Sequence, residues 1–265
     1  MQSDQFELTI LPGTNRCGER EGFGRITIRP GDTLSIVGAT GSGKSAFIND
    51  IEVLAQGDTI TGRTILMNGV PPPDDMVRDP SKKPIALITQ NTRVIADHTV
   101  CRFLALHIKA RGTDAQELIA RTLALANQFT GEQIAESMRM TSLSGGQTRA
   151  LLIADAILIG QTPILLLDEV ENAGIFKERV IGCLKHYNKA VIFVTHDPLL
   201  ALITDRRIVM KYGAVVSVLT PLDRERRVIS CISNMDAFIQ NLREKIRAGA
   251  LIEEAVPLEN IEVPA

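Results

Sequence analysis

Eight consecutive residues, 38–45, have the types and spacing of a loop that binds phosphate groups. An apolar run at 34–37 precedes them, a helix-like stretch at 46–54 follows, and they read Gly38, Ala39, Thr40, Gly41, Ser42, Gly43, Lys44 and Ser45. Glycines allow consecutive backbone N–H groups to converge on phosphate oxygens, and the N-terminus of the following helix favours negative charge. Lys44 would reach the terminal phosphates of a nucleotide, and Ser45 would ligate the Mg²⁺ that bridges them. A glycine- and serine-rich turn that binds nothing is the alternative, but the strand, loop and helix order favours nucleotide binding.

Two carboxylates stand at the end of a second apolar run. Asp168 and Glu169 follow residues 164–167, and ligands of open parallel sheets bind at the carboxyl ends of the strands. Asp168 would hold Mg²⁺ through its water shell, while Glu169 would accept a proton from the attacking water or orient it. Strands also end in solvated acids that have no function. The phosphate-binding loop in the same chain, which we expect beside this strand, therefore favours the catalytic interpretation.

A third motif lies just upstream of the acidic strand. It consists of Leu143, Ser144, Gly145, Gly146 and Gln147, and an apolar stretch at residues 150–159 follows it. Taken alone, the motif could be a helix start with a serine cap and two flexible glycines.

The elements that must position these motifs alternate along the chain. Short apolar runs bounded by turn residues predict strands at 6–10 and 25–29, and a hairpin at 62–69 closed by Asn68 and Gly69. Continuous apolar runs predict buried strands at 85–89, 164–167 and 191–195. Helical spacing of apolar residues extends from 100 to 138, with further helices at 178–186 and 234–248. A final strand pair, 207–211 and 214–219, would turn through Tyr212 and Gly213.

Composition excludes several classes of protein. Lys and Arg total 29 against 31 Asp and Glu, so no global basic field favours nucleic acid. The four cysteines form no C-x-x-C pair and indicate neither a zinc site nor a disulfide framework, as expected in a reducing cytosol. We expect no secretory signal at the N-terminus, and the apolar stretches fall short of the roughly 20 residues that a membrane helix needs.

Taken together, the motifs resemble the nucleotide-binding subunit of the ATP-binding cassette (ABC) family. Residues 38–45 match Walker A, residues 164–169 match Walker B, and residues 143–147 match the family signature. Gln90 stands at the Q-loop position at the end of its strand, and His196 stands at the position of the switch histidine. The resemblance covers about residues 5–220.

The resemblance implies an α/β fold. Its core would be that of a P-loop NTPase with a mostly parallel sheet, an N-terminal antiparallel β subdomain and an inserted helical subdomain. We expect a single ABC domain over 1–225, a helical insert at about 92–150 and a C-terminal helical tail at 226–265.

The resemblance also implies a mechanism with ATP and Mg²⁺ as ligands. Two cassettes would pack head to tail, so that Ser144, Gly145, Gly146 and Gln147 of one face the γ-phosphate held by Lys44 of the other. His196 would contact the γ-phosphate and hold the attacking water with Glu169, although a lone histidine at a strand end is often just a surface residue. Gln90 would sense Mg²⁺ and the water.

Three departures from the family pattern stand out. The family's adenine-stacking aromatic residue is missing from 13–17, where Arg16 could stack instead through its guanidinium plane. The residues after Glu169 lack the usual D-loop carboxylate. Asp155 replaces an arginine that is usual in the helix after the signature. These features predict an outlying branch.

Two functions remain open. The first is an ATP hydrolase that drives a separate membrane permease from the cytoplasmic face. The second is a soluble cassette that uses ATP-driven clamping to remodel or activate a partner protein or a metallocofactor enzyme. A DNA-repair clamp is disfavoured because no long heptad segment interrupts the cassette, and no direct contact with nucleic acid is predicted.

Overall fold

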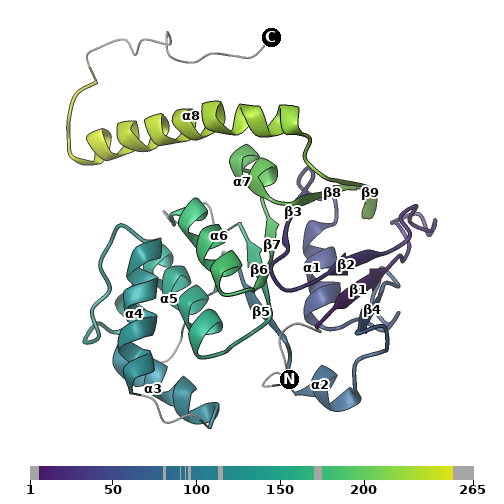
Figure 1. Ribbon diagram of the computed structural model, residues 1–265, viewed down its shortest axis with the longest axis horizontal. Coiled ribbons are helices and arrows are strands. Elements are labelled where there is room, and N and C mark those ends of the chain that lie inside the picture. The colour runs from purple at the N-terminus through teal and green to yellow at the C-terminus, as the bar shows by residue number, and fades with distance from the viewer. Residues whose placement is uncertain are drawn as a thin grey trace.

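The computed structural model describes residues 6–79, 82–89, 91–92, 94, 97–112, 116–169 and 175–252. Within these residues the chain forms a small sheet and a large sheet, with helices packed around the large one (Figure 1). The small sheet has the order β2-β1-β4 and is antiparallel. Its strands are β1 (Leu8–Leu11), β2 (Ile26–Ile28) and β4 (Thr64–Met67). The strand and the Asn68-Gly69 turn predicted at 62–69 are present, but the second arm of the hairpin is reduced to a single bridge from Met67 to Val70, and β4 pairs along its length with β1.

The large sheet has the order β5-β6-β7-β3-β8-β9 in the described part of the chain. Neighbouring strands from β5 to β8 are parallel, and only β9 runs antiparallel to its neighbour. The strands are β5 (Ile85–Ile88), β6 (Ile164–Asp168), β7 (Ala190–Val194), β3 (Thr33–Val37), β8 (Arg206–Lys211) and β9 (Ala214–Leu219). The carboxyl ends of five strands therefore lie at one edge of the sheet, where ligands of such folds bind.

The central strands are buried on both faces, which explains why they read as continuous apolar runs. Alternate side chains of β6 enter two separate cores: Leu165 and Leu167 pack on one face, and Ile164 and Leu166 pack on the other. The first core lies under α3 (Val100–Ala110), α4 (Glu117–Phe129), α5 (Gly145–Leu158) and α6 (Lys177–His186). The second contains α1 (Lys44–Glu52) and the small sheet. The predicted α/β class, with a mostly parallel sheet, an antiparallel β unit and a helical insert, is confirmed.

The remaining helices lie at the periphery. Helix α2 (Asp74–Arg78) follows β4, and α7 (Pro198–Ile203) connects β7 to β8. The last helix, α8 (Asp223–Arg247), begins well before the predicted start at Asn234 and packs against α7 (Figure 1). Lys177, at the start of α6, forms ion pairs with Asp197 and with Asp236. Because Asp236 belongs to α8, the second pair attaches α8 to α6.

Candidate nucleotide-binding site

The predicted phosphate-binding loop connects β3 to α1. Residues 38–43 follow the end of β3, and Lys44 begins the helix. A Cβ atom at Gly38 would lie 2.4 Å from the carbonyl oxygen of Met210, and one at Gly43 would lie 2.8 Å from Cα of Gly213. Only glycine fits at these two positions, because the loop lies directly on the backbone of β8 and the β8–β9 turn. The N-terminal N–H groups of α1 have no acceptor within the helix and carry its positive dipole end.

The polar groups of this loop are those that a phosphate would bind. Lys44 Nζ donates to the carbonyl oxygens of Gly38 at 2.8 Å and Ala39 at 3.3 Å, so the ammonium group lies back over the loop. The hydroxyl of Ser42 is buried and has no hydrogen-bond partner among the described residues. An unpaired buried hydroxyl costs about 1–3 kcal/mol, which a ligand that accepts or donates a hydrogen bond there would offset. The ammonium group of Lys44, the unpaired hydroxyl of Ser42 and the N-terminus of α1 together fit a nucleotide phosphate.

The second motif lies at the same edge of the sheet, but not next to the loop. Strand β7 stands between β3 and β6, so the segment after β7 separates the loop from Asp168 and Glu169. Asp168 is the half-buried last residue of β6, and the Glu169 N–H donates to the carbonyl of Val194 in β7 at 3.0 Å. Glu169 has φ 50°, an unusual conformation for a non-glycine residue, directly at the predicted catalytic position.

His196 follows β7 and faces the acidic strand end. Its Nε2 lies 3.7 Å from Oε1 of Glu169, and the histidine and glutamate side chains are 49% and 32% exposed. Both groups can therefore reach a ligand at this edge. Ser45 is exposed at the start of α1 and, with the carboxylate of Asp168, offers oxygen ligands of the kind that Mg²⁺ prefers. Gln90 lies outside the described residues, as do residues 170–174 of the D-loop region.

The third motif begins α5. Ser144 is the N-cap: its side chain accepts from the Gln147 N–H at 3.2 Å, and Gln147 Oε1 accepts from the Ser144 N–H at 2.9 Å. This capping box satisfies two helix-terminal donors. Ser144 and Gly145 are exposed, whereas Gly146 and Gln147 are buried and the Gln147 amide also donates to the carbonyl of Gln133. Ser144 therefore starts the helix as expected from a serine cap, and together with Gly145 it also forms an exposed tip at the beginning of α5.

Asp155, the residue that departs from the family pattern, lies on the same helix and pairs across to α3. Its Oδ2 is 2.8 Å from Nδ1 of His107. The hydrogen bond to Asp155 raises the pKa of His107 above its ordinary value, and partial burial opposes this increase. The contact ties α3 to α5.

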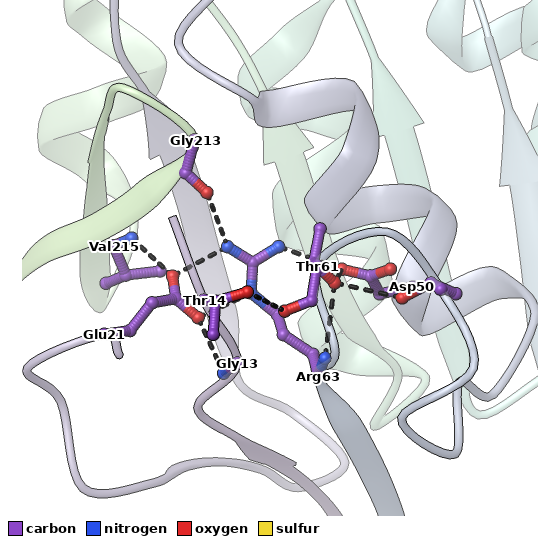
Figure 2. A network of polar contacts seen from close by, with 9 residues as sticks. Gly13, Thr14, Glu21, Asp50, Thr61, Arg63, Gly213 and Val215 are labelled. Atoms are coloured by element: carbon purple, nitrogen blue, oxygen red, sulfur yellow. Dashed lines mark hydrogen bonds and ion pairs between the residues drawn. The ribbon is translucent and has the colours of Figure 1, made fainter. Parts of the chain in front are cut away.

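A buried charge network, which the sequence analysis did not predict, contacts the helix that follows the phosphate-binding loop (Figure 2). The guanidinium group of Arg63 lies between Glu21 and Asp50, with nitrogen–oxygen distances of 2.7 and 2.9 Å, and the side chains are 0–2% exposed. Burial lowers the pKa of Arg63, but its hydrogen bonds and charge contacts with the two carboxylates outweigh this effect and raise it. Because Asp50 belongs to α1, the network attaches the phosphate-loop helix to the small sheet.

Comparison with known proteins gives the family. Residues 25–172, more than half of the chain, match the sequence profile described as ABC transporter. The chain belongs to the ATP-binding cassette (ABC) family. An uncharacterised ABC transporter ATP-binding protein of Methanocaldococcus jannaschii is 46% identical over 243 residues, which cover 92% of this chain and 93% of that protein. The spermidine/putrescine import ATP-binding protein PotA of Thermotoga maritima is 29% identical over 75% of this chain, which spans 54% of PotA.

Solved ABC structures share the fold. A dimeric ATP-binding cassette in a post-hydrolysis state, bound to ADP and Pi, superposes with a TM-score of 0.61 at 25% identity, covering 81% of this chain and 98% of that one. The cbiO1 protein of Clostridium perfringens has the same TM-score at 20% identity over 92% of this chain, a likeness of fold alone. The chain is thus an ABC-type ATPase, as the resemblance implied. Among the described residues, no helix has the length and apolar character needed to cross a membrane.

Proposed function

We propose that this ABC ATPase binds MgATP between two copies packed head to tail, and that hydrolysis powers a separate membrane permease. The observation that carries the proposal is the meeting of Glu169 and His196 at the sheet edge that also holds the Lys44 loop. An exposed Ser144-Gly145 tip on a different subdomain supports the shared site. Relatives named as import ATP-binding proteins and a dimeric cassette with ADP and Pi point the same way.

Each residue then has a defined task. Lys44 and the N–H groups of residues 41–45 bind the phosphates, and Ser45, Asp168 and Gln90 hold Mg²⁺. The metal ion, when bound, neutralises charge on the phosphate oxygens. Glu169 orients the attacking water or accepts its proton, and His196 holds the γ-phosphate and the same water. Ser144, with the Gly145 and Gly146 amides of the second copy, completes the cage around the γ-phosphate.

The dimer is tested by a trapped state. Glu169→Gln should bind ATP with Mg²⁺, lose turnover and elute as a dimer on a sizing column, because the bound nucleotide is no longer cleaved. Lys44→Ala should lose nucleotide affinity and remain monomeric under the same conditions, and chelation of Mg²⁺ should stop phosphate release by the wild type. A monomer of Glu169→Gln with saturating ATP would contradict the shared site.

The permease is tested by co-purification from detergent-solubilised native membranes. We expect a protein with several membrane spans to accompany the ATPase. Recovery with a soluble redox or cofactor enzyme instead would favour the alternative function, in which the same ATP-driven clamp remodels or activates a partner.

A further inference from the structure

The strand order indicates where the nucleoside end of ATP must lie, given the proposed function. Glu169 and His196 follow β6 and β7, which are on one side of β3, and β8 is on the other side. The γ-phosphate must face Glu169 and His196. The rest of the nucleotide therefore extends across the loop toward the end of β8, where Tyr212 and Gly213 form the turn into β9.

This turn lies directly against the phosphate-binding loop. The Gly213 N–H donates to the carbonyl of Ser42 at 2.8 Å, and a Cβ atom at Gly213 would lie 2.9 Å from Cγ of Arg16. The Arg16 N–H donates to the carbonyl of Tyr212 at 3.4 Å, and its guanidinium donates to the carbonyl of Gly41 at 2.6 Å. Tyr212 and Arg16 thus border the end of the loop that is farther from Glu169 along the sheet.

Tyr212 has features that the turn itself does not require. Both turn residues have positive φ, 52° at Tyr212 and 85° at Gly213, a conformation for which Asn or Asp normally precedes Gly. A bulky side chain there is strained, and such strain often marks a functional position. Tyr212 is 70% exposed as a residue, and the ammonium group of Lys211 lies 5.2 Å from the centroid of its ring. A ring with a cation on one face leaves the other face for a flat ligand.

The buried network holds this turn in place (Figure 2). Arg63 Nη2 donates to the carbonyl of Gly213 at 2.9 Å, and Glu21 Oε1 accepts from the Val215 N–H at 2.7 Å. The other oxygen of Glu21 accepts from the Gly13 N–H at 3.0 Å, at the start of the loop that carries Arg16. The turn, the loop that carries Arg16 and α1 are therefore all fixed to the buried Arg63, and such preorganisation lowers the ordering cost of ligand binding.

We propose that Tyr212 is the adenine platform of this ATPase, stacking its open ring face on the base in place of the aromatic residue that is missing from 13–17. The assignment rests on the proposed function, because it takes the orientation of ATP from the catalytic role of Glu169. Arg16, held on Gly41, borders the same space. The chemistry is that of a purine ring on a phenol ring, and it is largely tolerant of which base is bound.

The test uses Tyr212→Asn, because asparagine suits the turn and keeps the fold while removing the ring. ATP affinity should fall about tenfold, whereas the affinity for magnesium tripolyphosphate should not change. Tyr212→Phe should bind ATP like the wild type. Equal loss of ATP and tripolyphosphate binding, or no loss of either, would overturn the assignment. Loss of ATP affinity in Arg16→Ala but not in Tyr212→Asn would assign the stacking to Arg16 instead.

A fluorescent reporter gives an independent readout, because the chain contains no tryptophan. The emission of Tyr212→Trp should be quenched by ATP and not by tripolyphosphate. Val70→Trp is the matched control. Val70 is also exposed, but it lies in the turn after β4, at the end of that strand away from the phosphate-binding loop. The emission of Val70→Trp should not respond to ATP. Quenching of both variants, or of neither, would overturn the proposal. Failure of the wild type to bind either ligand would instead refute the proposed function.

Discussion

Nε2 of His196 lies 3.7 Å from Oε1 of Glu169, across the ends of the adjacent strands β7 and β6. The contact is set by the sheet register, in which Asp168 pairs with Val194 and the Glu169 N–H donates to the Val194 carbonyl. The sheet thus holds together two side chains that can donate to or accept from the same water. The residues that face the γ-phosphate in our proposal come from strands far apart in sequence.

His196→Ala should lower the rate of phosphate release by about 10²–10³-fold, the range for loss of one hydrogen-bond donor that stabilises charge in the transition state. ATP affinity should stay near that of the wild type, because the phosphates remain bound to the loop. Steady-state and single-turnover assays measure the two effects separately. His98→Ala is the matched control, since His98 is also exposed but lies before α3, and it should retain full turnover.

Ser144 has two roles that can be separated by substitution. Ser144→Ala removes the cap of α5, which should cost about 1 kcal/mol of unfolding free energy. Ser144→Asp keeps a capping oxygen and the stability, but places a carboxylate against the γ-phosphate of the second copy. In the Glu169→Gln background, Ser144→Asp should therefore abolish the ATP-dependent dimer seen by sedimentation. A stable Ser144→Asp protein that still dimerises with ATP would contradict the shared site.

Arg63→Met should strongly destabilise the fold, because it removes the buried cation that pairs with the carboxylates of Glu21 and Asp50. Breaking a buried pair on one side typically costs 3–5 kcal/mol, roughly the loss we expect in urea unfolding. Arg29→Met is the control: Arg29 pairs with Glu7 at the surface and its side chain is 69% exposed. Its loss should cost at most about 1 kcal/mol.

The pairing of His107 with Asp155 predicts a pH-dependent stability. Because the folded pKa of His107 is raised above the ordinary 6.5, its contribution is fully present below that value and is lost as pH rises through the folded pKa. His107→Gln should therefore destabilise the protein more at about pH 5.5 than at about pH 8.5. Urea unfolding of both proteins at each pH measures the difference. An equal difference at the two pH values would show that the pair is neutral.

The local parts of the site could be predicted from residues that lie close together in the chain. Glycine spacing with Lys44 predicted a strand, loop and helix, and Ser144 as a cap predicted a helix start, because these structures depend on hydrogen bonds between residues close in the chain. Continuous apolar runs identified β5, β6 and β7 as strands buried on both faces. At 62–69 the strand and the turn were predicted, but the main partner of β4 is β1, a choice that local turn chemistry cannot make.

Which of these parts lie side by side depends on contacts between segments that are distant in the chain. Strand order depends on how crossover helices pack on the sheet, and that order placed β7 between β3 and β6 and put Tyr212 beside the phosphate-binding loop. Arg63 likewise contacts Glu21, Asp50 and Gly213, which lie on separate segments of the chain. The periodic spacing of apolar residues does not predict such a network. Long-range contacts follow from burying two apolar faces of one sheet at once, a requirement of the whole chain rather than of any segment.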